Sequence, residues 1–212
     1  MSRVVLATHN AHKVDELKAI LALVPELSGL QIVGAGQIGA PSPVEDGVTF
    51  ADNALLKARA TVAATGLPAL ADDSGLCVDV LGGAPGVFSA RWAGSHGDDA
   101  ANLALLLDQI ADVPDAHRGA EFRCAAALVT PDGVERVETG VLRGRLTRAP
   151  RGTGGFGYDP ILEPEVQPDR ANGVVLTSAE LSPAEKNAIS HRGHAFRAMV
   201  PHLVALLGSA AR

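Results

Sequence analysis

The feature that most constrains this chain is a short apolar run, 67–71, that leads directly into two adjacent carboxylates, Asp72 and Asp73. The run has the length of a buried β-strand. Neighbouring side chains of a strand point to opposite faces, so the two carboxylates are expected to do different jobs. One would meet a metal ion or serve as a catalytic base, while the other would orient the first or bind backbone.

Ser74 and Gly75 follow the acidic pair and have the character of a turn. The pattern therefore predicts a strand that delivers the two carboxylates to a sharp turn. A second interpretation stays open at this point, because Asp, Ser and Gly are the residues that any polar turn favours.

The composition bounds the class of protein. With 212 residues, 47% hydrophobic and 20% charged, the chain predicts a soluble globular protein with one large domain or two small lobes. No apolar run reaches the ~18 residues of a membrane span, and the N-terminus lacks the layout of a signal peptide. Cys77 and Cys124 make neither a disulfide framework nor a zinc site. We therefore expect a cytoplasmic protein that does not interact with membranes.

The net charge of −6 disfavours nucleic-acid binding, since the sequence contains no basic patch to neutralise a phosphate backbone. An anionic ligand would have to be held by a few local charges.

The first 24 residues predict a strand (4–7), a polar loop (8–10) and a helix that begins at Ala11. The free N–H groups of the first turn, with Lys13 beside them, would form an anion site. The alternative is an ordinary N-cap with a solvated lysine.

A second helix is predicted after Thr49, with Lys57 on it and two acids, Glu45 and Asp46, in the turn before it. These acids are either metal ligands or residues favoured by the helix dipole. Further along, we expect a strand at 30–33, a helix over 96–110, and a hairpin of two strands joined by Pro131–Gly133. Ser182–Glu185 reads as a capping box that starts a helix.

Four glycines stand within Arg151–Asp159, and they would let the backbone approach a ligand closely. Phe156 and Tyr158, if exposed on such a loop, would suit stacking on a flat base; the alternative is that they fold into the core. The loop lacks both the P-loop ending and the strand–helix setting of a dinucleotide fingerprint. Later, His191 and Arg192 could donate hydrogen bonds to a phosphate or a base carbonyl, or simply form a solvated face.

Taken together, these stretches resemble the inosine/xanthosine triphosphate pyrophosphatase family, which acts on non-canonical purine nucleoside triphosphates. The motifs that carry the resemblance occur in the family's order and span nearly the whole chain: Ala7–Lys13, Thr49–Arg59, Ala71–Gly75 through Ala90–Trp92, Gly154–Pro160 and Leu181–Gly193. The resemblance implies a single α/β domain over 1–212, with an elongated mixed β-sheet flanked by helices and two lobes around a central substrate cleft. It also implies a homodimer.

The implied reaction is hydrolysis of ITP, dITP or XTP to the monophosphate and pyrophosphate with Mg²⁺ as cofactor. The resemblance assigns Asp73 as proton acceptor and metal ligand, with Glu45 and Asp72 as further carboxylates on the metal side. The substrate contacts that it implies are Thr8, His9, Asn10, Ala11, His12, Lys13, Lys57, Ser74, Phe156, Gly157, Tyr158, Asp159, Lys186, His191 and Arg192.

The chain departs from the family's pattern at two places. Some relatives carry acids at both positions that match 44 and 45 of this chain, three and two residues before the glycine. Here position 44 is Val44, and the acids are Glu45 and Asp46. We take Glu45 as the metal position. His9 replaces a small residue of many relatives.

Two rival functions are weighed against this one. A pyrophosphatase for modified pyrimidines, as in the septum-formation-inhibitor family, would share the N-terminal strand, loop and lysine and the acidic turns. The Gly-Gly-Phe-Gly-Tyr-Asp and Ser-His-Arg-Gly motifs argue against it. A nucleotide sensor without turnover would have no need for Glu45, Asp72 and Asp73.

Overall fold

The computed structural model describes residues 3–8, 11–169 and 173–210, apart from the side chains of residues 11–12 and 208–210. The chain divides into two compact units. Unit 1 comprises Met1–Asp73, Cys124–Gly140 and Arg192–Arg212, and unit 2 comprises Ser74–Arg123 and Val141–His191.

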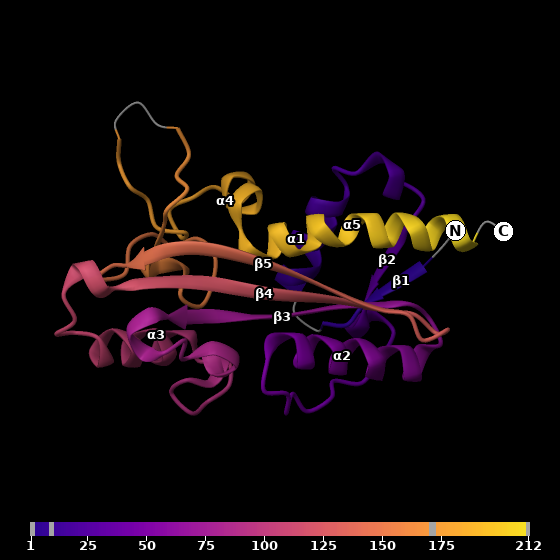
Figure 1. The fold of residues 1–212 in the computed structure, drawn as a ribbon, viewed down its shortest axis with the longest axis horizontal. Coiled ribbons are helices and arrows are strands. Elements are labelled where there is room, and N and C mark those ends of the chain that lie inside the picture. The colour runs from indigo at the N-terminus through magenta and orange to yellow at the C-terminus, as the bar shows by residue number, and fades with distance from the viewer. Residues whose placement is uncertain (1–2, 9–10, 170–172, 211–212) are drawn as a thin grey trace. The chain divides into compact units, whose positions relative to one another are not determined.

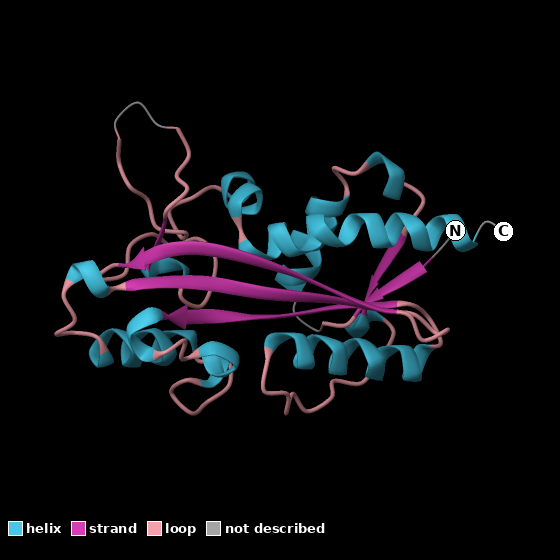
Figure 2. Ribbon diagram, in the orientation of Figure 1, coloured by secondary structure: helices cyan, strands magenta, loops and turns pink. Residues whose placement is uncertain are grey.

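Within the described ranges, six strands form one sheet in the order β2-β1-β3-β4-β5-β6 (Figure 1). The three long strands β3, β4 and β5 each contribute residues to both units. The strands are β1 (Arg3–Leu6), β2 (Gln31–Gly34), β3 (Ala69–Val78), β4 (Gly119–Val129), β5 (Glu135–Leu146) and β6 (Leu162–Pro164). The helices are α1 (Ala11–Leu21), α2 (Phe50–Thr65), α3 (Asp99–Gln109), α4 (Pro183–Ile189) and α5 (His191–Ala210), shown in cyan in Figure 2.

The sheet is mixed, because β1 pairs in parallel with β2 and β3 whereas β5 pairs antiparallel with β6. The α/β class with a mixed, helix-flanked sheet is thus confirmed. Two local predictions are confirmed as well. Thr130–Val134 close the turn between β4 and β5 with a backbone hydrogen bond of 3.0 Å, and Ser182 and Glu185 form the capping box of α4.

In unit 1, the alternation of strand side chains sorts the core into two layers. Leu70 of β3 packs with Cys124, Ala126 and Leu128 of β4 against the apolar faces of α1 and α5. The neighbouring residues face the other way and meet α2, which lies on the opposite side of the strands from α5 in Figure 1. Apart from Val129, the buried members of this second layer are all alanines: Ala7, Ala54, Ala58, Ala69, Ala71, Ala125 and Ala127. Because alanine is small, this layer allows α2 to approach the sheet closely enough for Asn53 to contact Asp73 of β3.

The turn predicted at Ser74 and Gly75 is wrong, since β3 continues without interruption to Val78. The reason is tertiary packing: Leu76 and Val78 are fully buried in the core of unit 2 with Leu106 of α3 and with Ile110, the residue that follows this helix. Burial of these side chains outweighs the turn preference of the Ser-Gly pair.

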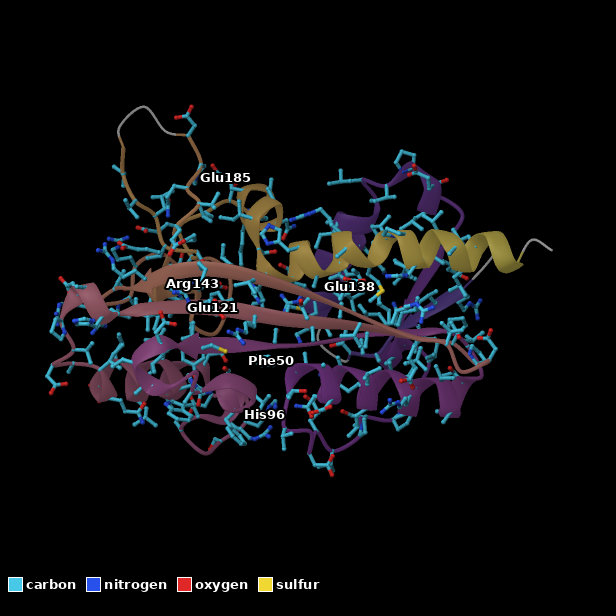
Figure 3. All side chains as sticks on the ribbon, in the orientation of Figure 1. Phe50, His96, Glu121, Glu138, Arg143 and Glu185 are labelled. Carbon is cyan, nitrogen blue, oxygen red and sulfur yellow. The ribbon has the colours of Figure 1, made fainter. Side chains whose placement is uncertain are left out.

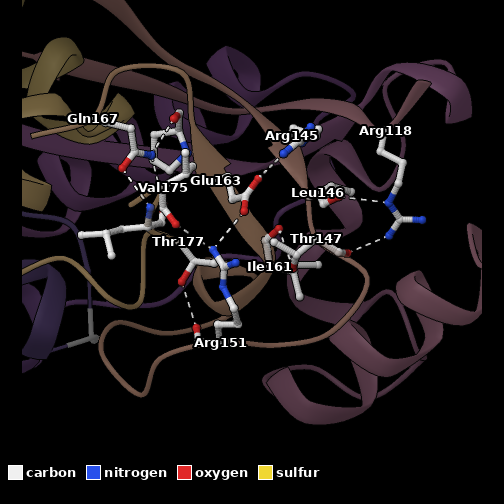
Figure 4. Close-up of polar contacts among 12 residues, drawn as sticks. Arg118, Arg145, Leu146, Thr147, Arg151, Ile161, Glu163, Gln167, Val175 and Thr177 are labelled. Carbon is white, nitrogen blue, oxygen red and sulfur yellow. Dashed lines mark hydrogen bonds and ion pairs between the residues drawn. The ribbon is translucent and has the colours of Figure 1, made fainter. Parts of the chain in front are cut away.

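A buried arginine closes one end of unit 2. Arg118 is 1% exposed and donates hydrogen bonds to the carbonyl oxygens of Ile110 (2.6 Å), Leu146 (3.0 Å) and Thr147 (2.7 Å); the last two are drawn in Figure 4. The Ile110 carbonyl lies just after α3, where helical carbonyls lack partners within the helix. Arg118 therefore ties the end of α3 to the end of β5.

Glu163 of β6 anchors the start of the glycine-rich segment of unit 2. Its carboxylate accepts from Arg145 (2.8 Å) and from Arg151 (2.9 Å), as Figure 4 shows. Arg151 also donates to the Val175 carbonyl, while its own carbonyl accepts from the Thr177 hydroxyl. These contacts hold the first residue of the glycine-rich loop in place.

A charge network of unit 2 lies nearer the surface. Arg143 of β5 donates to Glu121 of β4 at 3.1 Å and to Asp79 at 2.9 Å. Arg143 and Glu121 are labelled in Figure 3. The side chain of Asp79 is 51% exposed, so water screens this pair.

Unit 1 contains a buried ionic network around Asp72, whose side chain is 1% exposed. Its Oδ2 accepts from Nζ of Lys13 on α1 (3.1 Å) and from Nε of Arg192 on α5 (3.2 Å). Arg192 also contacts Glu16 of α1 at 2.5 Å. Burial alone would raise the pKa of Asp72, but the charges of Lys13 and Arg192 outweigh it and hold that pKa well below its usual range.

No helix in the described ranges combines the length and apolarity that crossing a membrane demands.

The ionic network generates a stability prediction. Replacing Asp72 with asparagine leaves Lys13 and Arg192 without their shared counter-charge, and breaking such a buried pair costs about 3–5 kcal/mol. We expect Asp72→Asn to lower the free energy of unfolding by about that amount at pH 7, measured by urea denaturation. Asp79→Asn, which removes a screened surface partner, should cost less than about 1 kcal/mol.

The stability difference between the wild type and Asp72→Asn should also depend on pH. The pKa of Asp72 is depressed in the folded state, so its contribution is fully present above its unfolded pKa of about 3.9 and is lost as the pH falls further, towards the folded pKa. The stability difference between the wild type and Asp72→Asn should stay constant from pH 7 to about 5 and shrink below about 4. A difference that is small at pH 7, or that shrinks near neutrality, would contradict this assignment.

Candidate active site

Asp73 faces α2, on the opposite side of β3 from the partners of Asp72. Its Oδ2 accepts from Nδ2 of Asn53 at 3.0 Å, and its Oδ1 lies 3.5 Å from Nζ of Lys57. Asn53 and Lys57 stand four residues apart on α2, a spacing that puts both on one helix face. The alanine layer beneath that face brings them within reach of the sheet.

Lys57 stands between two carboxylates. Its Nζ also lies 3.1 Å from Oε2 of Glu45, in the loop before α2. Burial lowers the pKa of Lys57, but the charges of Asp73, Asp72 and Glu45 outweigh burial and raise it, so the ammonium stays charged. Burial raises the pKa of Asp73; Lys57 and the Asn53 hydrogen bond act against that shift, while Glu45 adds to it.

The N-terminus of α2 places the Glu45 loop. The helix predicted after Thr49 is confirmed. Thr49 caps it by accepting a hydrogen bond from the backbone N–H of Asp52, and Asp52 completes a capping box. Glu45 itself is half-buried, whereas Asp46 is exposed.

This arrangement fits a magnesium ion that also binds a ligand. Glu45 and Asp73 offer carboxylate oxygens on either side of a cationic group, and Mg²⁺ usually takes one or two protein carboxylates with phosphate oxygens and waters. Within the described part of the chain, no group of three or more His, Cys, Asp or Glu side chains could hold a metal ion. A metal here would therefore take further ligands from a substrate and water. Asp72 is already engaged by Lys13 and Arg192.

The predicted loop before α1 is only partly described. Lys13 lies in the first turn of α1, and its side chain is 19% exposed beside Asp72. His9 and Asn10 lie outside the described residues, as do the side chains of Ala11 and His12. Thr8 is half-buried after β1.

In unit 2, Asp159 organises the glycine-rich loop. Its buried Oδ2 accepts from the backbone N–H of Phe156 (2.8 Å) and from Nζ of Lys186 (2.7 Å). Gly155, with φ of +73°, passes so close to this carboxylate that a Cβ would collide with it. The Phe156 ring is 40% exposed, with the Lys186 ammonium 5.1 Å from its centroid. Phe156 and Lys186 thus form one partly open face.

Tyr158 does not share that face, because for this residue the alternative of folding into the core is the one observed. Its side chain is 5% exposed, packs in the core of unit 2 and donates a hydrogen bond to the Ser89 carbonyl at 2.9 Å. The residue before it remains part of the loop: the N–H of Gly157 donates to Asp99 at the start of α3.

The two residues predicted near the C-terminus have separate surroundings. His191 is 7% exposed, and its ring stacks on Phe122 at 5.0 Å in unit 2. The Arg192 side chain is 2% exposed and joins Asp72 and Glu16 in unit 1, so the solvated face considered for this pair is wrong. Ser74 is half-buried on β3.

Asn53 is the residue of this site to which the sequence reasoning gave no role. Its i, i+4 spacing to Lys57 was the signal that could have found it.

Comparisons with known proteins identify the family of this chain. The model of the Ham1 family matches residues 4–202. A dITP/XTP pyrophosphatase from Streptomyces coelicolor is 64% identical over 98% of this chain and 100% of its own length, and one from Leifsonia xyli subsp. xyli is 57% identical over 97% and 98%.

Solved structures are similar over nearly the whole chain. A HAM1 protein from Coxiella burnetii has a TM-score of 0.81 and 38% identity, covering 99% of this chain and 100% of that one. A nucleoside-triphosphatase, or dITP/XTP pyrophosphatase, from Mycobacterium abscessus has a TM-score of 0.74 and 49% identity, covering 94% and 99%. With its full-length relatives, matching fold and family-model match, this chain belongs to the Ham1 family.

Proposed function

We propose that this protein hydrolyses the non-canonical purine nucleoside triphosphates ITP, dITP and XTP to the monophosphate and pyrophosphate. The observation that carries the proposal is the Glu45–Lys57–Asp73 cluster in a chain 64% identical to a dITP/XTP pyrophosphatase. Such an enzyme removes deaminated purines from the nucleotide pool.

Mg²⁺ is proposed as the cofactor, held by Glu45 and Asp73, where it would neutralise phosphate charge and lower the pKa of a bound water. Asp73 would accept the proton of the attacking water, a role that suits a carboxylate whose burial raises its pKa towards the working pH. Lys57 would exchange its carboxylate partners for phosphate oxygens, to which a compact ammonium is suited. Lys13 would bind phosphate beside the first turn of α1.

The base is proposed to stack on Phe156, the exposed aromatic of the glycine-rich loop. Hypoxanthine and xanthine carry a carbonyl at C6 where adenine carries an amino group. Donors directed at that carbonyl would leave adenine facing unmatched donors, and unpaired buried donors reject a wrong substrate strongly.

We further propose that the protein acts as a cytoplasmic homodimer, as its family resemblance implies. Light scattering coupled to gel filtration tests the dimer: a mass near twice the 21.7 kDa of one chain supports it, and the monomer mass contradicts it.

The reaction is tested by following product release from ITP, XTP, ATP and GTP in parallel, with Mg²⁺ and with EDTA. We expect rapid pyrophosphate release from ITP and XTP, little from ATP and GTP, and none in EDTA. Orthophosphate as the product would mean attack at the terminal phosphate and would overturn the proposed chemistry. Tight nucleotide binding without any product would support the sensor instead.

Asp73→Asn should fold normally and lose about 10²–10⁴-fold in kcat, the range for loss of a general base. Because burial already disfavours the charged form of Asp73, the neutral amide should not destabilise the fold. Steady-state kinetics with ITP and thermal unfolding measure both effects. Asp46→Asn, which neutralises an exposed carboxylate near the same site, is the control and should retain activity. A near-wild-type rate for Asp73→Asn would remove this residue from the proposed role.

Phe156→Ala should raise KM for ITP about 5- to 150-fold, since stacking on an aromatic side chain contributes about 1–3 kcal/mol per base. Phe88→Ala is a matched control, because Phe88 is 52% exposed in the same unit and lies under a cation, Arg91, at 5.3 Å. Its KM should be unchanged. Equal KM values for wild type and Phe156→Ala would rule out stacking on this ring.

A further inference from the structure

Asn53 joins two parts of the proposed metal site through one side chain. It is 1% exposed in the first turn of α2. Its Nδ2 donates to Oδ2 of Asp73 at 3.0 Å, and its Oδ1 accepts from the backbone N–H of Gly47 at 2.8 Å. Gly47 is two residues after Glu45, so the amide links the strand that carries one carboxylate to the loop that carries the other.

The chemistry of these partners fixes the orientation of the amide. The N–H of Gly47 can only donate, and an ionised Asp73 can only accept. Of the two possible orientations of the amide, only the one with oxygen towards Gly47 and nitrogen towards Asp73 satisfies both. A carboxylate or an apolar side chain at this position could not do so.

This contact requires glycine at position 47. A Cβ at residue 47 would lie 2.6 Å from Oδ1 of Asn53 and 2.9 Å from its backbone nitrogen. The second distance involves helix backbone, which cannot move aside cheaply. Glycine thus lets the Glu45 loop rest directly on the first turn of α2.

We propose that Asn53 is a positioning residue that holds Asp73 and the Glu45 loop in the relation needed to bind Mg²⁺ and activate water. This inference rests on the proposed function. Groups that orient metal ligands typically contribute 10–100-fold to metal affinity or activity.

The chain offers a matched control in unit 2. Asn102 is also 1% exposed and also the fourth residue of its helix, α3. Its Oδ1 accepts from the backbone N–H of Ala93 at 2.7 Å, as Asn53 does from Gly47. Its Nδ2, however, has no hydrogen-bond partner among the described residues, and so no carboxylate to orient.

The test compares Asn53→Ala, Gly47→Ala and Asn102→Ala. Mn²⁺ affinity is measured by electron paramagnetic resonance on the nucleotide-free protein, and kcat and KM are measured with ITP. We expect Asn53→Ala to lower Mn²⁺ affinity and kcat by roughly 10–100-fold while KM changes little. Gly47→Ala should also lower both the Mn²⁺ affinity and kcat. Asn102→Ala should lower the Tm and leave metal affinity and kcat unchanged.

A further variant, Asn53→Asp, keeps the volume of the side chain and its acceptor for Gly47 but removes the donor to Asp73. It should lose kcat at least as strongly as Asn53→Ala, whereas a residue that only anchors Gly47 would leave this variant active. Folded Asn53 variants with wild-type Mn²⁺ affinity and kcat would overturn the inference. If the wild type itself released no pyrophosphate from any nucleotide, the proposed function would fail separately, and the Mn²⁺ comparison would still decide the role of Asn53.

Discussion

The candidate site depends on the alternation of side chains along β3. Asp72 and Asp73 are neighbours in sequence, yet one faces α1 and α5 and the other faces α2. The first is buried between two cations, Lys13 and Arg192, and holds helices from distant parts of the chain against the same strand. The second meets an amide and a lysine, with Glu45 beyond them. A strand thereby gives two identical side chains different environments.

The two environments have opposite electrostatic consequences. Cations outweigh burial at Asp72 and lower its pKa, so its charge stabilises the folded chain. Burial prevails at Asp73 and raises its pKa, so the folded chain bears a cost for that charge. A group that the fold disfavours in its charged form gains from a metal or a proton, which is the property a reactive carboxylate needs. The alanine layer under α2 contributes indirectly, because it lets Lys57 and Asn53 reach the strand.

Much of this could be predicted from the sequence, since it depends on local patterns. The apolar run ahead of the acidic pair, the hairpin at 131–133 and the capping box at Ser182 are short-range signals. The continuation of β3 past Ser74 was not predictable in this way, because it follows from the burial of Leu76 and Val78 in a core built by later residues. The burial of Arg192 likewise depends on a partner 120 positions away, Asp72. The burial of Tyr158 also depends on a distant partner, because its hydroxyl donates a hydrogen bond to the carbonyl of Ser89.

We propose that Asp73 serves the chemistry while Asp72 serves the fold. A crystal structure with Mg²⁺ and a non-hydrolysable ITP analogue tests it most directly. We predict metal–oxygen distances of about 2.0–2.1 Å to Asp73 and Glu45, with Lys57 moved onto phosphate oxygens and Asp72 still paired with Lys13 and Arg192. A metal ion bound by Asp72, with Asp73 still held by Lys57, would contradict it.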